Sequence, residues 1–340
     1  MKQDTKLLMV LIGAVLITSG CMNGESGEAS SEALAVNEFS TSPNPAPADQ
    51  NTNMQMQLEN VGDATAEDVN VYIFGPAIDD DDRTWTAEEG QIMQFGDLGE
   101  AQENQPAIPQ QETLTLKSPN IAEGRNLPYD FNSQIYYGYG TTASTTIELM
   151  SQERYQETGA TQSSTTAQNS DGPIHIDIQG STPIVFQPDS EGVREEELCI
   201  IVNNVATGSA FDYDDLPVLD SNSEYDEDIV TVEIEDVGGV EFQADNEDED
   251  ERDTNIGVEA DIELIGNEGF HCYTMEASSG QNLEQTVNIE LEAEYGYIEE
   301  TSTSITVEGR GTGSTGSTDS TEDDSEDSED TGPPPMPGGD

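Results

Sequence analysis

Residues 54–74 read MQMQLENVGDATAEDVNVYIF, and apolar and polar side chains alternate at both ends of this stretch. The alternating apolar residues are Met54, Met56 and Leu58 before its centre, and Val69, Val71 and Ile73 after it. A period of two is typical of half-buried β-strands. Residues 60–63 (NVGD) lie between the two runs and are rich in turn-forming types. The stretch therefore predicts two antiparallel strands joined by a turn.

The same alternation recurs along the chain, for example at residues 114–116, 131–137 and 147–149. Clusters of Gly, Pro, Asn and Asp bound these runs, and no stretch of ten or more residues shows a strong helical period. Several short strands at such spacing predict an all-β fold made of antiparallel β-sandwiches.

The chain contains an internal repeat. Residues 137–149 (YGYGTTASTTIEL) have a counterpart beginning Tyr-Gly-Tyr at residues 295–307, an offset of 158 residues. Residues 58–61 (LENV) are echoed by residues 202–205 (VNNV) at an offset of 144, so the second copy contains about 14 extra residues (158 − 144). We expect these extra residues within the acidic segment 212–255.

The repeat predicts two modules, residues 35–152 and residues 172–309. A linker at residues 153–171, rich in Gln, Ser, Thr and Gly, is expected between them. Residues 310–340 are expected to form a disordered acidic tail, because from Gly311 onward they contain nine acids and neither a basic nor an aromatic residue.

The segment 58–71 resembles the N-x-G-x-x-x-A-x-x-V-x-V pattern of archaeal and bacterial extracellular immunoglobulin-like repeats, the CARDB-like or S-layer-associated domains. The matching positions are Asn60, Gly62, Ala66, Val69 and Val71. In such a unit a strand ends at the Asn, the Gly permits the turn, the Ala packs under it and the next strand follows. The resemblance implies two immunoglobulin-like antiparallel β-sandwich domains in tandem, with a surface or adhesive role.

The charge is strongly one-sided, with 72 acidic and 9 basic residues and a formal net charge of −63. Like charge at this density opposes a compact state at low salt, whereas molar salt shortens the Debye length to about 3 Å. The composition therefore favours a halophilic organism, archaeal or bacterial. A calcium-storage protein is the alternative. Nucleic-acid binding is disfavoured, because a phosphate backbone requires clustered Lys and Arg.

The first 21 residues resemble a lipoprotein signal peptide. A short basic segment precedes an apolar run at residues 7–17, and Thr18-Ser19-Gly20-Cys21 follows. The run is shorter than the roughly 20 residues that span a bilayer. We therefore expect lipidation at Cys21, a flexible tether at residues 22–34 and a position on the extracellular face of the cell membrane. An ordinary signal peptide that happens to contain a cysteine is the alternative.

Two further cysteines, Cys199 and Cys272, lie in strand-like segments. An even pair in an exported chain predicts a disulfide, here closing a loop of about 70 residues. Two buried free thiols or a metal site are the alternatives.

No motif for catalysis, a cofactor or a metal stands out. The two histidines, His175 and His271, lack an HExxH context, and neither Gly-x-Ser-x-Gly nor a phosphate-binding glycine loop with Lys is present. The acid runs 79–82 and 245–253 are expected to be solvated loops, with surface calcium binding as the alternative. Trp85 is expected either as a loop contact residue or in the core. The tyrosines are expected in strand packing; they are Tyr136, Tyr137, Tyr139, Tyr295 and Tyr297.

These features together predict an exported, lipid-anchored structural, adhesive or interaction module, and not an enzyme. The expected partners are the membrane through the lipid on Cys21, envelope proteins or glycans, and surface cations. A lipid-anchored binding protein for a solute or polysaccharide is the alternative, and a secreted hydrolase is a third.

Overall fold

A computed structural model describes residues 30–76, 78, 84–87, 90–101, 107–187, 195–218, 226–235, 240–244, 258–277 and 284–310. The fold is mostly β, as predicted, with three main antiparallel sheets. The predicted lipid site at Cys21 and the acid runs 79–82 and 245–253 lie outside the described residues, as does the predicted tail from residue 311 onward. Within the described ranges, no helix has the length and hydropathy needed to cross a bilayer.

One four-stranded sheet has the order β1 (Leu34–Ser42), β3 (Asn51–Asn60), β7 (Gln110–Lys117), β5 (Thr86–Ala87). A second has the order β11 (Ile174–Gln179), β14 (Glu195–Asn204), β19 (Glu268–Ala277), β17 (Val240–Ala244).

The largest sheet has ten strands. Six of them have the order β18 (Val258–Glu263), β16 (Ile229–Ile234), β20 (Glu284–Glu308), β8 (Asn126–Ser151), β4 (Ala66–Phe74), β6 (Ile92–Leu98). The remaining four pair at the sides: β10 (Gln168–Asn169) and β13 (Ile184–Phe186) with β8, and β2 (Ala46–Pro47) and β15 (Ser209–Phe211) with β20. The short strands β9 (Ser163–Ser164) and β12 (Ser181–Thr182) pair with each other, and the helical segments are α1 (Gln152–Thr158) and the 3₁₀ turn η1 (Tyr213–Val218).

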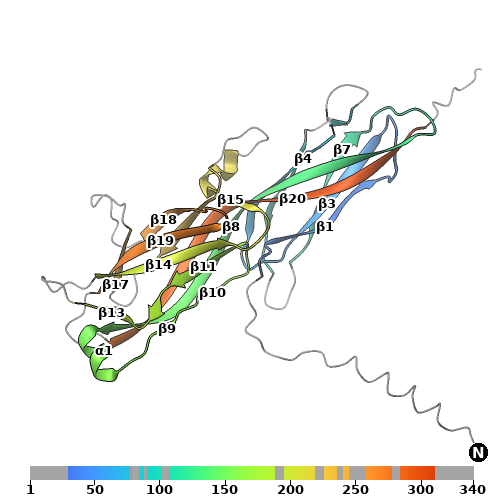
Figure 1. Ribbon diagram of the computed structural model, residues 1–340. Coiled ribbons are helices and arrows are strands. Elements are labelled where there is room, and N and C mark those ends of the chain that lie inside the picture. Colours follow the sequence, from blue (N-terminus) through green and yellow to red (C-terminus); the bar gives the residue numbers. More distant parts are fainter. Residues whose placement is uncertain are drawn as a thin grey trace, which may run out of the picture.

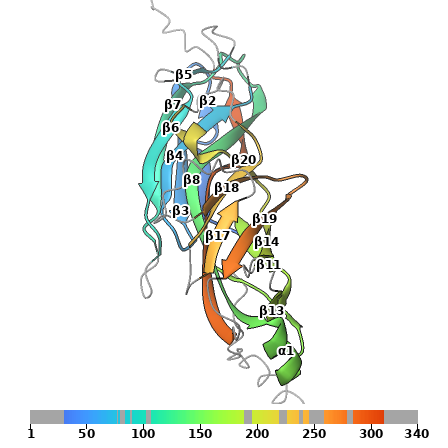
Figure 2. The ribbon, with the colours of Figure 1, turned by 90° about the vertical axis from the view of Figure 1, so that its left-hand side faces the viewer.

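Two long strands connect the halves of the molecule. β8 has 26 residues and β20 has 25, and they pair antiparallel from Asn126↔Glu308 to Met150↔Glu284 (Figures 1 and 2). At about 3.3 Å per residue, this ribbon spans about 80 Å. The first half of β8 pairs also with β4, whereas its second half pairs with β10 and β13.

Both four-stranded sheets cover the same face of the ribbon. The odd-numbered residues of β8 from Phe131 to Leu149 are buried, as are those of β20 from Val287 to Tyr297. Odd residues of β8 pair with odd residues of β20, so these side chains share one face. Across the layers, the Tyr273 hydroxyl of β19 donates to the Val232 carbonyl of β16, 3.0 Å away. The core is a two-layered structure that continues from one half into the other.

The internal repeat corresponds to real structural equivalence. β8 begins at Asn126 and β20 begins 158 residues later at Glu284, while β3 at 51–60 and β14 at 195–204 differ by 144 throughout. Tyr137↔Tyr297, Gly138↔Gly296 and Tyr139↔Tyr295 are paired residues, so an approximate twofold axis passes between the two glycines.

The extra residues of the second copy can now be placed. Val71 pairs with Ile135, and Val232 pairs with Ala293, 158 residues after Ile135. The offset therefore rises from 144 to 161 (232 − 71) before β16, which locates the insertion in the segment between β15 and β16. That segment contains η1 and lies within the expected range 212–255.

The strand pairing differs from the expectation of separate modules at residues 35–152 and 172–309. The second half of β8, within the first predicted module, pairs with the first half of β20 from the second. The predicted linker 153–171 also contributes β10 to the large sheet. Strand pairing is a long-range choice that hydrophobic period alone does not encode, so the sequence revealed the two copies but not their exchange of strands.

Candidate functional site: the waist of the molecule

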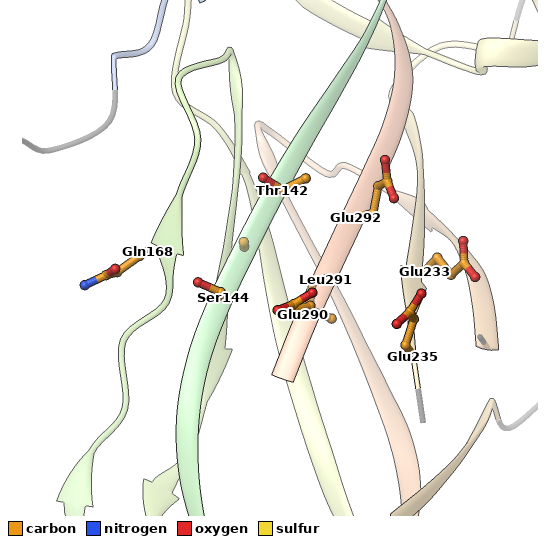
Figure 3. Close-up of a pocket in the computed structure, with 9 residues that line it drawn as sticks. Thr142, Ser144, Gln168, Glu233, Glu235, Glu290, Leu291 and Glu292 are labelled. Atoms are coloured by element: carbon orange, nitrogen blue, oxygen red, sulfur yellow. The ribbon is translucent and has the colours of Figure 1, made fainter. Parts of the chain in front are cut away.

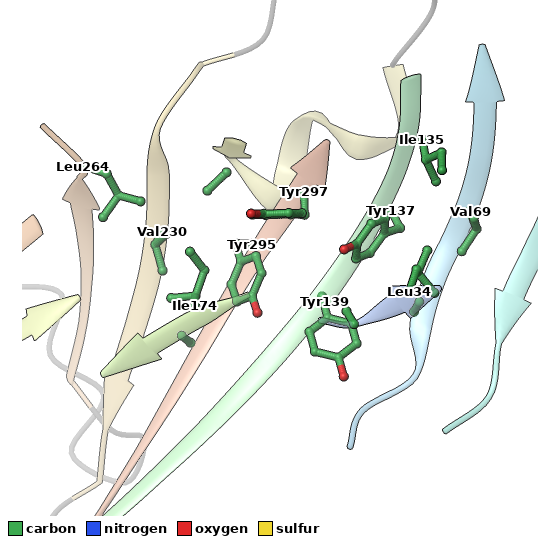
Figure 4. Packing of buried hydrophobic residues seen from close by; sticks show 14 of the residues in the cluster. Leu34, Val69, Ile135, Tyr137, Tyr139, Ile174, Val230, Leu264, Tyr295 and Tyr297 are labelled. Carbon is green, nitrogen blue, oxygen red and sulfur yellow. The ribbon is translucent and has the colours of Figure 1, made fainter. Parts of the chain in front are cut away.

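The two halves meet at a cluster of four tyrosines, which we call the waist. Tyr137 and Tyr139 come from β8, and Tyr295 and Tyr297 come from β20 (Figure 4). The rings form a closed square, because the four neighbouring ring centroids are 5.8–6.2 Å apart. All four side chains are buried. The prediction that these tyrosines pack between strands is confirmed for this set.

Each tyrosine hydroxyl has a partner. Tyr297 donates to Asn204 Oδ1 at 2.9 Å, and the hydroxyls of Tyr295 and Thr141 are 2.7 Å apart. Tyr139 donates to the Asp171 carbonyl at 3.1 Å. Burial raises the pKa of Tyr139 to about 12 and the pKa of Tyr295 well above its usual range. The phenols therefore stay neutral at physiological pH and act as structural hydrogen-bond groups.

Tyr137 donates instead to a carboxylate, Glu299 Oε1, at 2.5 Å. Burial is the main cause that raises the pKa of Glu299, the hydrogen bond from Tyr137 opposes this change, and the charge of Glu32 adds to it. The pair is the most buried carboxylate contact of the waist. It is positioned to titrate with the packing of the two halves.

Two equivalent asparagines fix the turns that border the waist. Asn60 Nδ2 donates to the Ala64 carbonyl at 2.7 Å, and Asn60 Oδ1 accepts from the Gly62 amide at 3.1 Å. Asn204 makes the same pair of bonds, to the Gly208 carbonyl at 2.8 Å and from the Ala206 amide at 3.2 Å. The predicted end of a strand at Asn60 is therefore confirmed.

Gly62 is required for a reason other than the one expected from the sequence. A Cβ on Gly62 would lie 2.0 Å from the Tyr139 hydroxyl. The backbone of Gly62 is not in the left-handed region. The glycine therefore allows Tyr139 to approach the turn closely, and the predicted role in permitting the turn conformation is wrong.

The opposite face of the ribbon is covered at the waist by the inserted segment. A Cβ on Gly138 would lie 2.6 Å from the Tyr213 ring, and a Cβ on Gly296 would lie 2.2 Å from the Phe211 ring. Phe211, Leu216 and Ile298 form a small buried cluster there. The Tyr-Gly-Tyr motif thus places tyrosines on one face and leaves room for aromatic rings on the other.

Cys199 and Cys272 are paired directly across β14 and β19, and their sulfur atoms lie 2.06 Å apart, at disulfide distance. Both lie between buried inward-facing neighbours, so the bridge is on the outer face of the sheet. Glu197 lies close enough to form a potential ligand group with the two sulfurs. Sulfurs joined in a disulfide offer no thiolate for a metal.

The other singled-out side chains belong to the packing. Trp85 is fully buried and lies edge-on to Phe131, with ring centroids 5.1 Å apart. The core alternative for Trp85 is therefore the observed one. His271 packs edge-on against Tyr273 at 4.8 Å, and within the described residues His175 belongs to a different strand, β11. The structure does not bring the two histidines together as inward-facing residues of one strand pair.

A shallow hollow of about 360 Å³ lies on the outer face of the large sheet. Its carboxylates are Glu233 and Glu235 of β16 and Glu290 and Glu292 of β20, and no basic residue lines it (Figure 3). Burial, and then the charge of Glu292, raises the pKa of the neighbouring Glu294. Sequence reasoning missed this surface, although its signal was visible as glutamate at every second position in residues 290–294.

Comparisons with known proteins add little. No protein-family model matches the chain, and the search of curated proteins gave no match. Twelve chains of solved structure match. One is the C-terminal globular domain of oligosaccharyltransferase from Pyrococcus abyssi, with 8% sequence identity and a TM-score of 0.18. The match covers 78% of this chain and 46% of that chain, so this chain spans less than half of that structure's length. A similarity at this TM-score supports no conclusion about fold or function.

Proposed function

We propose that this protein is an exported, lipid-anchored surface protein of a halophile, acting as a structural spacer or interaction module of the cell envelope. In this proposal its two halves are immunoglobulin-like sandwiches of the CARDB-like or S-layer-associated type. The observation that carries the proposal is the β8–β20 ribbon, in which 25 consecutive residues of each strand are paired. A continuous ladder of this length resists bending between the halves, which suits an element that holds a fixed distance.

The surface charge supports the same role. The outer face of the large sheet carries closely spaced glutamates, and the chain as a whole carries −63. In molar salt this charge is screened over about 3 Å, so the acids keep the surface hydrated without repelling neighbouring envelope proteins at longer range. The waist tyrosines are buried and neutral, which fits a structural role better than a catalytic one.

The test begins with the anchor. Mass spectrometry of the protein from salt-grown cells of its source, or from a halophilic host, is expected to show an acylated N-terminal Cys21. The Cys21→Ser variant should lose the acyl mass and appear in the medium. An unmodified Cys21 in a protein that stays inside the cell would refute export and anchoring together.

The partner is tested by a pull-down from surface-labelled cells in high salt, with mature protein as bait. Envelope proteins that are retained and crosslink to the bait support the spacer or interaction role. A bound glycan or small molecule with no protein partner would instead indicate the alternative, a binding protein for a solute or polysaccharide.

A further inference from the structure

The chain enters the fold at the waist and not at either end of the rod. The Gly172 amide donates to the Ser30 carbonyl at 2.9 Å, and the Ser30 amide donates to the Asp171 carboxylate. The Val61 amide donates to the Ala33 carbonyl at 2.8 Å, beside the turn that follows Asn60. Ser30 is therefore fixed next to the turns at the centre of the molecule (Figure 1).

The length of chain between Cys21 and Ser30 limits where an anchor can lie. Nine residues (30 − 21) reach at most about 30 Å. The ribbon extends 12 residues from Gly296 to each end of β20, which is about 40 Å in either direction. A lipid on Cys21 therefore holds the middle of the rod close to the membrane, which an end-attached tether would not do.

An exposed apolar patch lies beside this entry point. Val205, Ile265 and Phe270 are 41%, 79% and 55% exposed, and we call these three residues the waist patch. They are half of the large apolar side chains that are exposed among the described residues. Soluble surfaces carry scattered apolar side chains, but a cluster next to an anchor is informative.

Backbone hydrogen bonds connect the patch to the entry point step by step. Gly172, bonded to Ser30, is followed by Pro173, whose carbonyl accepts from the Val205 amide at 2.9 Å. The preceding Asn204 amide donates to the Asn267 carbonyl at 2.9 Å, within the turn that contains Ile265. Phe270 follows on β19, where it pairs with Ile201 on the outer face.

We propose that the waist patch contacts the lipid bilayer, so that the rod lies along the membrane surface instead of standing on it. The inference rests on the proposed lipid anchor at Cys21. With the lipid inserted, the short tether keeps the patch at a high local concentration near the bilayer, and a weak apolar contact is then sufficient. Phe270 and Ile265 are side chains that favour the boundary between headgroups and acyl chains.

A bilayer fits the patch better than a second copy of the chain does. A second copy would bring another chain with a net charge of −63 against a waist that already contains Asp171 and Glu268. The exposed apolar area is also confined to three side chains, far fewer than the residues of a stable protein interface. A zwitterionic bilayer held by the tether imposes neither requirement.

The experiment uses the full mature protein with a tryptophan placed in the patch. The Phe270→Trp variant is bound to phosphatidylcholine vesicles brominated on the upper acyl chain, in molar KCl. Because interfacial apolar side chains reach that depth, we expect the added emission to fall about twofold. Trp85 is fully buried and gives a constant background. The matched control is Leu127→Trp, which is 38% exposed but lies near the start of β8, far from the waist; its emission should not change.

Two ways of attachment separate this inference from the anchor itself. In one, the protein carries its native lipid; in the other, the Cys21 thiol is coupled to a maleimide lipid, while Cys199 and Cys272 stay bonded to each other. If the native form does not float with vesicles but the coupled form shows quenching at position 270, the native anchor is refuted and the patch contact stands. If vesicle-bound protein shows equal emission changes at positions 127 and 270, the contact is refuted.

Discussion

Cys199 and Cys272 lie opposite each other on two strands that are already paired over nine residue pairs. The bridge is on the outer face, so it does not fill the core. Its main effect is on the unfolded chain, because it closes a loop of 73 residues.

We expect the double variant Cys199→Ser/Cys272→Ser to lose about 4 kcal/mol of unfolding free energy on the chain-entropy estimate. Denaturant unfolding in high salt measures the loss, in a Cys21→Ser background that removes the remaining thiol. Reduced wild-type protein should unfold at the midpoint of the double variant. Unchanged midpoints in both samples would show that the bridge does not stabilise the fold.

Glu299 predicts a pH dependence. Because burial raises the pKa of Glu299, the folded protein binds a proton there more readily than the unfolded chain does. The stabilising contribution of this site is present below the ordinary carboxyl range and is lost as the pH rises through the raised pKa.

The Glu299→Gln variant keeps an acceptor for Tyr137 without the charge. We expect its stability relative to wild type to increase between pH 4 and pH 7, as measured by urea unfolding in molar salt. Glu308→Gln, an exposed change on the same strand, is the control and should follow wild type. A variant that parallels wild type across this range would contradict the buried-carboxylate effect.

At the scale of elements, the long strands depend on glycines where both faces are covered. In Gly296→Ala the new Cβ would lie 2.2 Å from the Phe211 ring, so the inserted segment must move. We expect a loss of about 1–3 kcal/mol, the usual cost of overpacking a core, measured by thermal or denaturant unfolding.

Gly140→Ala is the matched control on the partner strand. Its Cβ would find only the Ala293 carbonyl, at 3.7 Å, an ordinary contact. Its stability should stay within roughly 1 kcal/mol of wild type. Equal losses at both positions would mean that strand propensity, and not the contact with Phe211, controls the outcome.

At the scale of the whole molecule, the halves are held by strands that cross the waist. A protease site inserted at residues 160–161, between α1 and β9, would separate β8 from β20 along the chain but not in space. We expect the two fragments to stay associated after cleavage and to elute together in high salt, because the β8–β20 pairing remains. Fragments that separate while still folded would show that each half is independent.

The net charge makes a second prediction at this scale. The charge of −63 destabilises the compact state by self-repulsion, and salt reduces that repulsion. The unfolding temperature should therefore rise steeply from 0.1 M to 2 M KCl. A midpoint independent of salt would argue that the acids are not under mutual strain.

Part of the fold could be predicted because it is local. Alternation in residues 54–58 gives a strand wherever its partner lies, and Asn60 forms its turn with residues two and four positions onward. The repeat was visible in the Tyr-Gly-Tyr motifs, and the cysteines in two strand-like segments suggested their bridge. The exchange of strands was not predictable, because Tyr137 carries no local signal that its partner is Tyr297 instead of a strand of its own module.

The sequence by itself determined a strongly acidic, duplicated, all-β chain, since charge, period and repetition are properties of neighbouring residues. Only the tertiary structure decided that β8 and β20 form one ribbon, that four tyrosines meet around Gly138 and Gly296, and that Ser30 enters beside Val205. The physical reason is that these are contacts between residues far apart in the chain, and their choice depends on which complete set of strands buries the most apolar surface with every hydrogen bond made.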